Sequence, residues 1–214
     1  GRPMASNLCR KGFRLVVHDV NRDAVDELAS LQARPAESAG EVAAQSDVIV
    51  TMLPNSAIVE QVVAGPGGVL ENAKPGSVIM DMSTIDPLVT DALAQKAAAK
   101  GIGYVDAPVG RLAVHADRGE SLFMVGGSDA DFARVKPLLE GMGSTIHHCG
   151  PVGSGMRTKL VNNYLAVSLC QMNAEALALS QRFGLTLETT LDVLYGTTAV
   201  NGQLKVNWPN KVLI

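Results

Sequence analysis

The sequence predicts an α/β fold in which a doubly wound, mostly parallel sheet precedes an all-helical segment. Short β-branched or apolar runs alternate with helix-like segments up to about residue 150, a pattern typical of a sheet with helices on both faces. The runs at 47–53 and 77–82 are nearly continuous in apolar residues, as in strands buried on both sides. Beyond 150–155 the pattern changes, because residues 156–183 contain no strand-like run, no proline and no glycine.

Local sequence features predict the individual helices and strands. Residues 1–5 begin a helix, since Pro3 suits the first turn. Residues 13–19 form a β-branched strand that ends in an acid, and the helix at 21–31 has apolar side chains three residues apart. Further strands are predicted at 104–109, 122–127 and 145–149, and further helices at 91–100, 129–139, 156–183 and 186–194.

The chain divides into a sheet domain at 1–151 and the start of a helical domain at 152–214. Its first residue, Gly1, opens a helix with no strand before it, and the last four residues form an apolar run with no cap after it. We therefore expect the chain to be the middle of a longer protein, with both domains truncated.

Composition excludes several classes of protein. The chain has 214 residues, a net charge of −3 and only 4% aromatic residues, which argues against nucleic acid as a partner. No apolar stretch approaches the roughly 20 residues that span a bilayer. Three scattered cysteines, Cys9, Cys149 and Cys170, indicate reduced thiols and a cytoplasmic protein. No metal site is expected.

A candidate dinucleotide site lies at the carboxyl edge of the predicted sheet. Such a site needs a glycine-rich turn, a helix N-terminus for the pyrophosphate and an acid about 20 residues on for the ribose. Gly1 is the part of such a turn that the chain contains, and Asp19 ends its strand where the acid belongs. The acid favours NAD, whereas the nearby Arg22 would suit NADP. A surface acid after a strand is the structural alternative.

A second cluster lies at the start of the long helix. Lys159, Asn162 and Asn163 are spaced so that all three can share one helical face. Polar groups of this kind are costly to bury on an otherwise apolar helix without a purpose. Gly153 and Gly155, just before them, permit the close approach of a ligand or another backbone. The alternative is a lysine at a helix start, with asparagines that bond a neighbouring loop.

Two loops that follow strands also carry polar groups. Folds of this kind place their binding residues in such loops. In the loop at 106–111, Arg111 offers a planar fork of donors for a carboxylate or sulfonate, or is a solvated arginine. In the loop at 81–84 hydroxyl groups follow the strand, and a helix cap is the simpler explanation for them.

Five segments, at 1–5, 51–54, 81–84, 106–109 and 153–163, occur in one order and spacing. Together they resemble the β-hydroxyacid dehydrogenase family over essentially the whole chain. The resemblance implies a Rossmann domain joined by a long helix to an all-helical domain. It further implies NAD as cofactor, with NADP as the alternative, a small anionic aldehyde or hydroxy acid as substrate, and a homodimer or homotetramer.

The resemblance also implies residue roles. Lys159 matches the catalytic lysine, and Asn163 matches the amide that helps to hold the substrate. The matches for cofactor binding are Gly1, Asp19, Asn21, Arg22, Met52, Leu53, Pro54 and Thr84. The matches for substrate binding are Gly110, Arg111, Asn162, Asn163 and Tyr164.

One segment departs from the family pattern. Most members have Ser-Gly-Gly after Asp-x-Pro-Val, where this chain has Gly110, Arg111 and Leu112. This form, with residues 162–164 and 208–213, resembles the branch that reduces 3-sulfolactaldehyde, which is the predicted reaction. The alternatives are a 3-hydroxyisobutyrate or tartronate-semialdehyde type of dehydrogenase, and a non-catalytic dinucleotide-binding module. Imine reductases of the family usually replace the lysine, so Lys159 counts against them.

Overall fold

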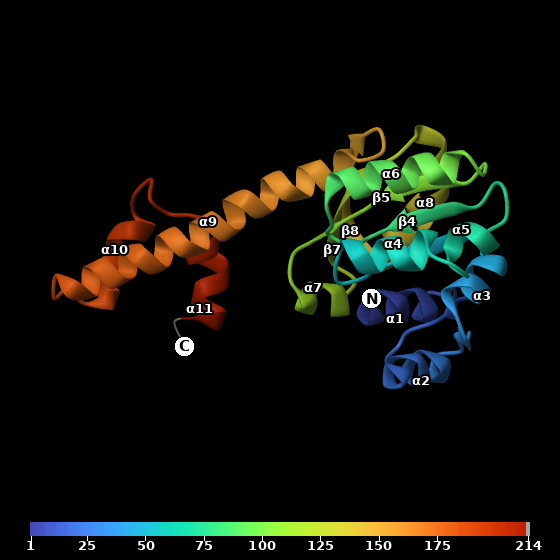
Figure 1. The fold of residues 1–214 in the computed structure, drawn as a ribbon. Coiled ribbons are helices and arrows are strands. Elements are labelled where there is room, and N and C mark those ends of the chain that lie inside the picture. Colours follow the sequence, from blue (N-terminus) through green and yellow to red (C-terminus); the bar gives the residue numbers. More distant parts are fainter. Residues whose placement is uncertain (213–214) are drawn as a thin grey trace. The chain divides into compact units, whose positions relative to one another are not determined.

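The structure is a computed structural model that describes residues 1–212 (Figure 1). It divides into two compact units, Gly1–Lys159 and Leu160–Ile214. The first unit contains the sheet and the second is helical. The change from sheet to helix that the sequence predicts is therefore present, although the predicted boundary at residue 151 stays a prediction.

The main sheet has six strands in the order β3-β4-β5-β7-β6, with β8 paired to β7. Strands β3 (Val48–Thr51), β4 (Val78–Asp81) and β5 (Gly103–Asp106) run parallel. Strand β7 (Ser121–Gly126) is antiparallel to β5 and β6 (Val109–Gly110) but parallel to β8 (Gly143–Gly150). A separate parallel pair consists of β1 (Val16–Val17) and β2 (Arg34–Pro35). The predicted α/β sheet is confirmed, with β7 as its antiparallel member.

Helices cover both faces of the sheet, as the sequence predicts (Figure 1). One face packs against α3 (Ala39–Ala44), α4 (Ser56–Ala64), α5 (Val69–Asn72) and α6 (Pro87–Ala98). The other packs against α1 (Arg2–Arg10) and α8 (Asp129–Met142). Helices α2 (Arg22–Ser30) and α7 (Ala113–Asp117) both contact α1.

Strand β4 shows why the fold forms. Its residues Val78, Ile79, Met80 and Asp81 are all buried, and alternate side chains enter the two opposite cores. Several helices begin at residues whose side chains accept the first free amides, as Asp86 does for α6 through the amide of Leu88 at 2.8 Å. The helix cap that the sequence allowed for residues 81–84 is therefore supplied by Asp86.

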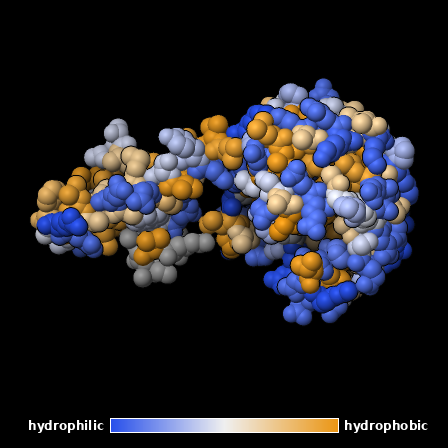
Figure 2. Space-filling view, viewed as in Figure 1, coloured by the Kyte–Doolittle hydropathy of each residue, from blue (hydrophilic) through white to orange (hydrophobic). Residues whose placement is uncertain are grey.

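The second unit has its own small core. Helix α9 (Ser154–Arg182) enters it, followed by α10 (Leu187–Tyr195), the π-helix η1 (Gln203–Asn207) and α11 (Trp208–Lys211). Leu177, Leu204 and Trp208 are buried together. Figure 2 shows apolar side chains on the outside of this helical part. The large hydrophobic residues that this unit exposes include Tyr164, Val167 and Phe183. No helix within residues 1–212 is long and apolar enough to cross a membrane.

Candidate active site

A row of buried polar side chains crosses the carboxyl ends of three neighbouring strands. Thr51 of β3 is in register with Asp81 of β4, which is in register with Asp106 of β5. Both carboxylates are completely buried. Ligands bind outside this edge of a parallel sheet, so the row underlies the region where a substrate and a cofactor would meet.

Asp81 organises the loops that follow β3 and β4. Its Oδ1 accepts a hydrogen bond from Thr51 Oγ1 at 2.9 Å and from the amide of Ser83 at 3.1 Å. The hydroxyl of Ser83 in turn accepts the amide of Leu53 at 2.9 Å. Burial raises the pKa of Asp81, and the bonds from Ser83 and Thr51 oppose that rise. The loop at 52–54, predicted to bind the cofactor, is thus tied to a buried carboxylate.

The first turn of α1 lies beside that loop. A Cβ placed on Gly1 would be 3.8 Å from the Cβ of Met52. The charge of Asp19 acts on the backbone nitrogen of Gly1, so Asp19 lies near the same helix start. Helix α1, Asp19 and Met52, which the sequence assigns to cofactor binding, therefore come together. Their donor set fits a dinucleotide, because backbone amides suit a pyrophosphate and an exposed carboxylate suits ribose hydroxyls.

The residues after Asp19 have local roles. The amide of Asn21 donates to Asp19 Oδ1 at 2.8 Å, and the Asn21 side chain begins α2 by accepting the amide of Asp23 at 3.1 Å. Arg22 is exposed and pairs with Glu37 at 3.2 Å. The oxygens of Asp19 and Asn21 that accept these amides order the turn around Asp19. Exposed Pro54 and Thr84 follow β3 and β4 at the same edge of the sheet.

Asp106 caps α9. Its Oδ1 accepts the amide of Gly153 at 2.6 Å, and its Oδ2 accepts the amide of Met156 at 2.6 Å. Burial raises the pKa of Asp106 and these two bonds oppose the rise. The first amides of a helix have no partner within the helix, and a buried carboxylate satisfies them and suits the helix dipole. In the sequence, Asp106 stands out only as the acid at a strand end.

A second anchor holds the same turn of α9 to α6. Arg157 Nη1 and Nη2 donate to Asp91 Oδ1 and Oδ2 at 3.0 and 2.7 Å, a bidentate pair. The guanidinium lowers the pKa of Asp91. In addition, the amide of Ile85 lies 3.4 Å from the sulfur of the buried Met156. Several elements of the first unit therefore fix where α9 begins.

Lys159 is half-buried, one turn further along α9. Its Nζ donates to the carbonyl oxygen of Val109 at 2.7 Å, in strand β6, just before the loop that leads to α7. Burial lowers the pKa of Lys159 below its ordinary value. A partly desolvated ammonium at the carboxyl edge of the sheet can stabilise negative charge on an oxygen and donate a proton to it.

Arg111 lies in the same loop, but its side chain has other partners. Its φ is +71°, in the left-handed region. Nη1 donates to the carbonyl of Glu120 at 2.5 Å and to Ser144 Oγ at 3.2 Å, and Nη2 donates to Thr145 Oγ1 at 3.1 Å. The guanidinium thus joins the loop to β8. Gly110, just before it, is buried in β6, where a Cβ would be 3.2 Å from Leu122.

The remaining predicted substrate residues lie beyond Lys159 in α9, within the second unit. The amide nitrogen of Asn162 donates to Asn163 Oδ1 at 3.3 Å. Asn162 is exposed, Asn163 is partly buried, and Tyr164 is 74% exposed. Their proposed contacts with a substrate stay predictions.

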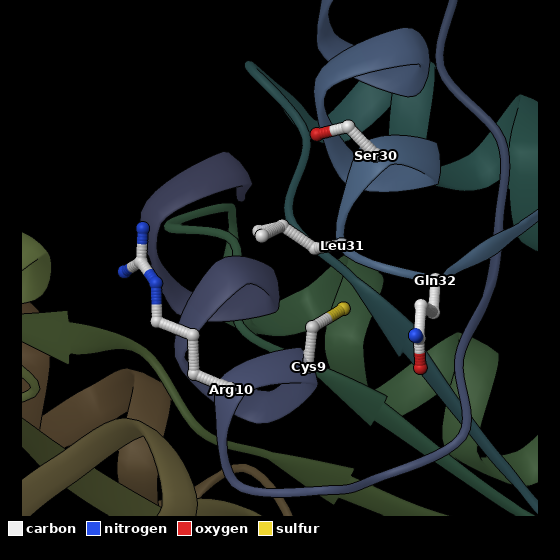
Figure 3. Close-up of a pocket in the computed structure, with 5 residues that line it drawn as sticks. All are labelled: Cys9, Arg10, Ser30, Leu31 and Gln32. Atoms are coloured by element: carbon white, nitrogen blue, oxygen red, sulfur yellow. The ribbon is translucent and has the colours of Figure 1, made fainter.

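A shallow pocket lies elsewhere, at the end of α1 and just after α2. It has a volume of about 270 Å³ and is lined by Cys9, Arg10, Ser30, Leu31 and Gln32 (Figure 3). It contains none of the residues that the sequence assigns to the site. Within residues 1–212, no group of three or more histidine, cysteine, aspartate or glutamate side chains could hold a metal ion.

The sheet, the acid after β1 and the lysine at the start of α9 define a nicotinamide-dinucleotide-dependent oxidoreductase with a following helical domain. The family model for the NAD binding domain of 6-phosphogluconate dehydrogenase matches residues 1–150. The model described as NAD-binding of NADP-dependent 3-hydroxyisobutyrate dehydrogenase matches residues 153–213. The chain belongs to the β-hydroxyacid dehydrogenase family.

Comparisons with individual relatives support the same family. The chain is 41% identical to the 3-sulfolactaldehyde reductase of Escherichia coli (strain K12) over 213 residues, which is 100% of this chain and 72% of the relative. It is 41% identical to the mitochondrial 3-hydroxyisobutyrate dehydrogenase of Mus musculus over 185 residues, 86% of this chain and 55% of that enzyme. The structure of Mycobacterium tuberculosis 3-hydroxyisobutyrate dehydrogenase with L-serine superposes with a TM-score of 0.88 at 31% identity, covering 96% of this chain and 69% of that one.

Proposed function

We propose that this protein reduces a small anionic aldehyde to its hydroxy acid with NADH, and that the aldehyde is 3-sulfolactaldehyde. The observation that carries the proposal is the half-buried Lys159, whose Nζ is held 2.7 Å from Val109 O at the carboxyl edge of the sheet. The 41% identity to a 3-sulfolactaldehyde reductase over the whole chain supports this choice of aldehyde.

The residues of the chain have distinct tasks in this proposal. The start of α1 and Asp19 hold the dinucleotide, and the loop at 52–54 with Thr84 lies beside it. When bound, the reduced nicotinamide supplies a hydride to the aldehyde carbon. Lys159 donates its proton to the oxygen on which negative charge develops. Asn163, four residues on in the same helix, holds the substrate beside the lysine.

The cofactor is proposed to be NAD rather than NADP. Asp19 is an exposed acid near the start of α1, and a carboxylate there repels a 2′-phosphate. Arg22, the side chain that would suit a 2′-phosphate, is paired with Glu37. Comparing kcat/KM for NADH and NADPH with one aldehyde tests this choice, and a preference for NADPH would overturn it.

A comparison of four aldehydes tests which of them is the preferred substrate. We would compare kcat/KM with NADH for 3-sulfolactaldehyde, succinic semialdehyde, methylmalonate semialdehyde and tartronate semialdehyde. A preference for the sulfonate supports the proposal. A preference for a carboxylate favours the second candidate, a 3-hydroxyisobutyrate type of dehydrogenase. Activity with none of the four would favour a non-catalytic dinucleotide-binding module.

The contacts of Arg111 bear on the choice between the two candidates. The side chain of Arg111, predicted to bind the sulfonate, is bonded to Glu120, Ser144 and Thr145. A guanidinium has five N–H donors, so these three bonds leave donors for an anion. The geometry therefore permits the sulfonate contact but also gives Arg111 a structural task.

Replacing Arg111 with serine separates these roles. If its free donors bind the sulfonate, kcat/KM should fall about tenfold more for 3-sulfolactaldehyde than for a carboxylate aldehyde, since a charge-assisted hydrogen bond is worth about 1.5–3 kcal/mol. Arg118→Ser is the matched control, because Arg118 follows the neighbouring α7 and is exposed. Equal losses on both substrates would assign Arg111 to the loop structure only.

The pH dependence follows from Lys159. Burial lowers its pKa, so its ammonium form is lost at a lower pH than that of an ordinary lysine at 10.5. Aldehyde reduction needs the ammonium form, so kcat/KM should fall as pH rises through the pKa of Lys159. Oxidation of the hydroxy acid needs the neutral amine and should rise through the same pKa. Rates measured in both directions across this range check the sign, and parallel profiles would contradict it.

The proposed protein is a cytoplasmic homodimer or homotetramer. Cys9, Cys149 and Cys170 are free thiols, as a reducing compartment requires. The helical unit exposes Val167 by 68% and Phe183 by 69%, and a contact between subunits would cover apolar side chains of this kind. Light scattering of the purified protein would test the assembly, and a monomer at micromolar concentration would contradict it.

A further inference from the structure

The segment from the end of β5 to the start of β6 contacts α9 at two points, one turn apart. Asp106 accepts the amides of Gly153 and Met156, each at 2.6 Å. Three residues after Asp106, the carbonyl oxygen of Val109 accepts Nζ of Lys159 at 2.7 Å. The same short segment therefore holds both the backbone of the first helical turn and the tip of the lysine side chain.

The packing around Asp106 leaves it little freedom. A Cβ on Gly155 would lie 2.8 Å from the carbonyl oxygen of Asp106, and a Cβ on Gly126 would overlap Asp106 Oδ1. Side chains at either glycine would therefore separate α9 from the sheet. The carboxylate is fully buried, so water cannot substitute for it as an acceptor.

We propose that Asp106 is a positioning residue for Lys159: it fixes the first turn of α9 so that the lysine ammonium is held at Val109 O. The inference rests on the proposed function, in which Lys159 is the proton donor. It adds that the geometry of this donor depends on a carboxylate that touches neither substrate nor cofactor. Movement of about 1 Å at a reacting group commonly costs about 10²-fold in rate.

Asp81 provides a matched comparison. It is the in-register neighbour of Asp106 and equally buried, but its bonds run to Thr51 and Ser83 and, through Ser83, to the loop at 52–54. Loss of a buried carboxylate is therefore common to variants at both positions, whereas loss of the α9 cap is specific to Asp106.

The test is Asp106→Asn in the intact protein. Asparagine keeps the shape but turns one acceptor into a donor that faces an amide. We expect kcat for aldehyde reduction to fall about 10²-fold while KM for NADH stays within twofold. We also expect the pKa of Lys159, measured by the pH dependence of its acylation rate with mass spectrometry, to rise toward 10.5 as the lysine becomes more solvated. In Asp81→Asn the pKa of Lys159 should not change.

The outcomes distinguish the positioning role of Asp106 from the proton-donor role of Lys159. An unchanged or lowered pKa of Lys159 in Asp106→Asn, or an equal change in Asp81→Asn, would overturn the positioning role. The acylation measurement needs no turnover, so it remains decisive even if Lys159 proves not to be the proton donor, which only the activity of Lys159 variants can show. If Asp106→Asn does not fold, Asp106→Ser tests the same prediction, because the shorter serine side chain has one oxygen and cannot accept the amides of Gly153 and Met156 as the two carboxylate oxygens do.

Discussion

Replacing Lys159 with alanine should lower kcat for aldehyde reduction by about 10²–10⁴-fold, the usual contribution of a positioned general acid. The expectation follows from the half-buried ammonium, which is bonded to Val109 O and has a pKa that burial lowers. Alanine removes both the proton and the charge that would stabilise a developing oxyanion. Steady-state kinetics with NADH and the preferred aldehyde measure the effect.

Two further variants make this result specific. Lys136→Ala removes an exposed lysine of α8 that pairs only weakly with Glu140 at 3.8 Å, and it should leave kcat unchanged. Lys159→Arg keeps the charge but holds its proton too tightly to donate it, so it should recover little of the turnover that Lys159→Ala loses. Near-normal turnover of Lys159→Ala, with the far-ultraviolet circular dichroism intact, would remove Lys159 from the mechanism.

A methyl group at Gly155 should strongly destabilise the fold. A Cβ at this position would be 2.8 Å from both the carbonyl oxygen of Asp106 and the amide nitrogen of Gly126, and closer still to the carbonyl oxygen of Met124. All three are backbone atoms in or beside buried strands and cannot give way as a flexible side chain does. Gly155→Ala should therefore lower the free energy of unfolding by about 3 kcal/mol.

Urea unfolding of Gly155→Ala beside Gly202→Ala measures this effect. A methyl group on Gly202 would have no neighbouring atom within 4 Å, so the free energy of unfolding of this variant should stay within about 0.5 kcal/mol of the parent value. If both variants were equally stable, α9 would not be seated as closely on β5 and β7 as the structure has it.

Long, strongly patterned elements were predictable from sequence because their local signals agree with their environment. Strand β4 is apolar throughout and is buried from both sides. Helix α9 was predicted at 156–183 and is observed at Ser154–Arg182. Short helices such as α3, α5 and α7 were not predicted, since four to six residues give too few turns for a periodic signal and their stability comes from packing.

The supporting carboxylates could not be found in the same way. Asp81 and Asp106 matter because parallel pairing puts them in register and helices bury them, and neither fact can be read along the chain. A pair of acids, each ending an apolar run, is the only signal that the sequence holds. The direction of the Arg111 side chain likewise depends on β8, more than thirty residues further along.

The partner of the lysine is a main-chain atom, and this has a consequence for how such an enzyme can diversify. Val109 offers Lys159 a carbonyl oxygen, which every amino acid at that position would also offer. The side chains of Val109 and Arg111 can therefore be exchanged during divergence, as one anion replaces another in the substrate, while the hydrogen bond to the proposed proton donor persists. Recognition and proton transfer are thus separable traits, and one can be selected for without rebuilding the other.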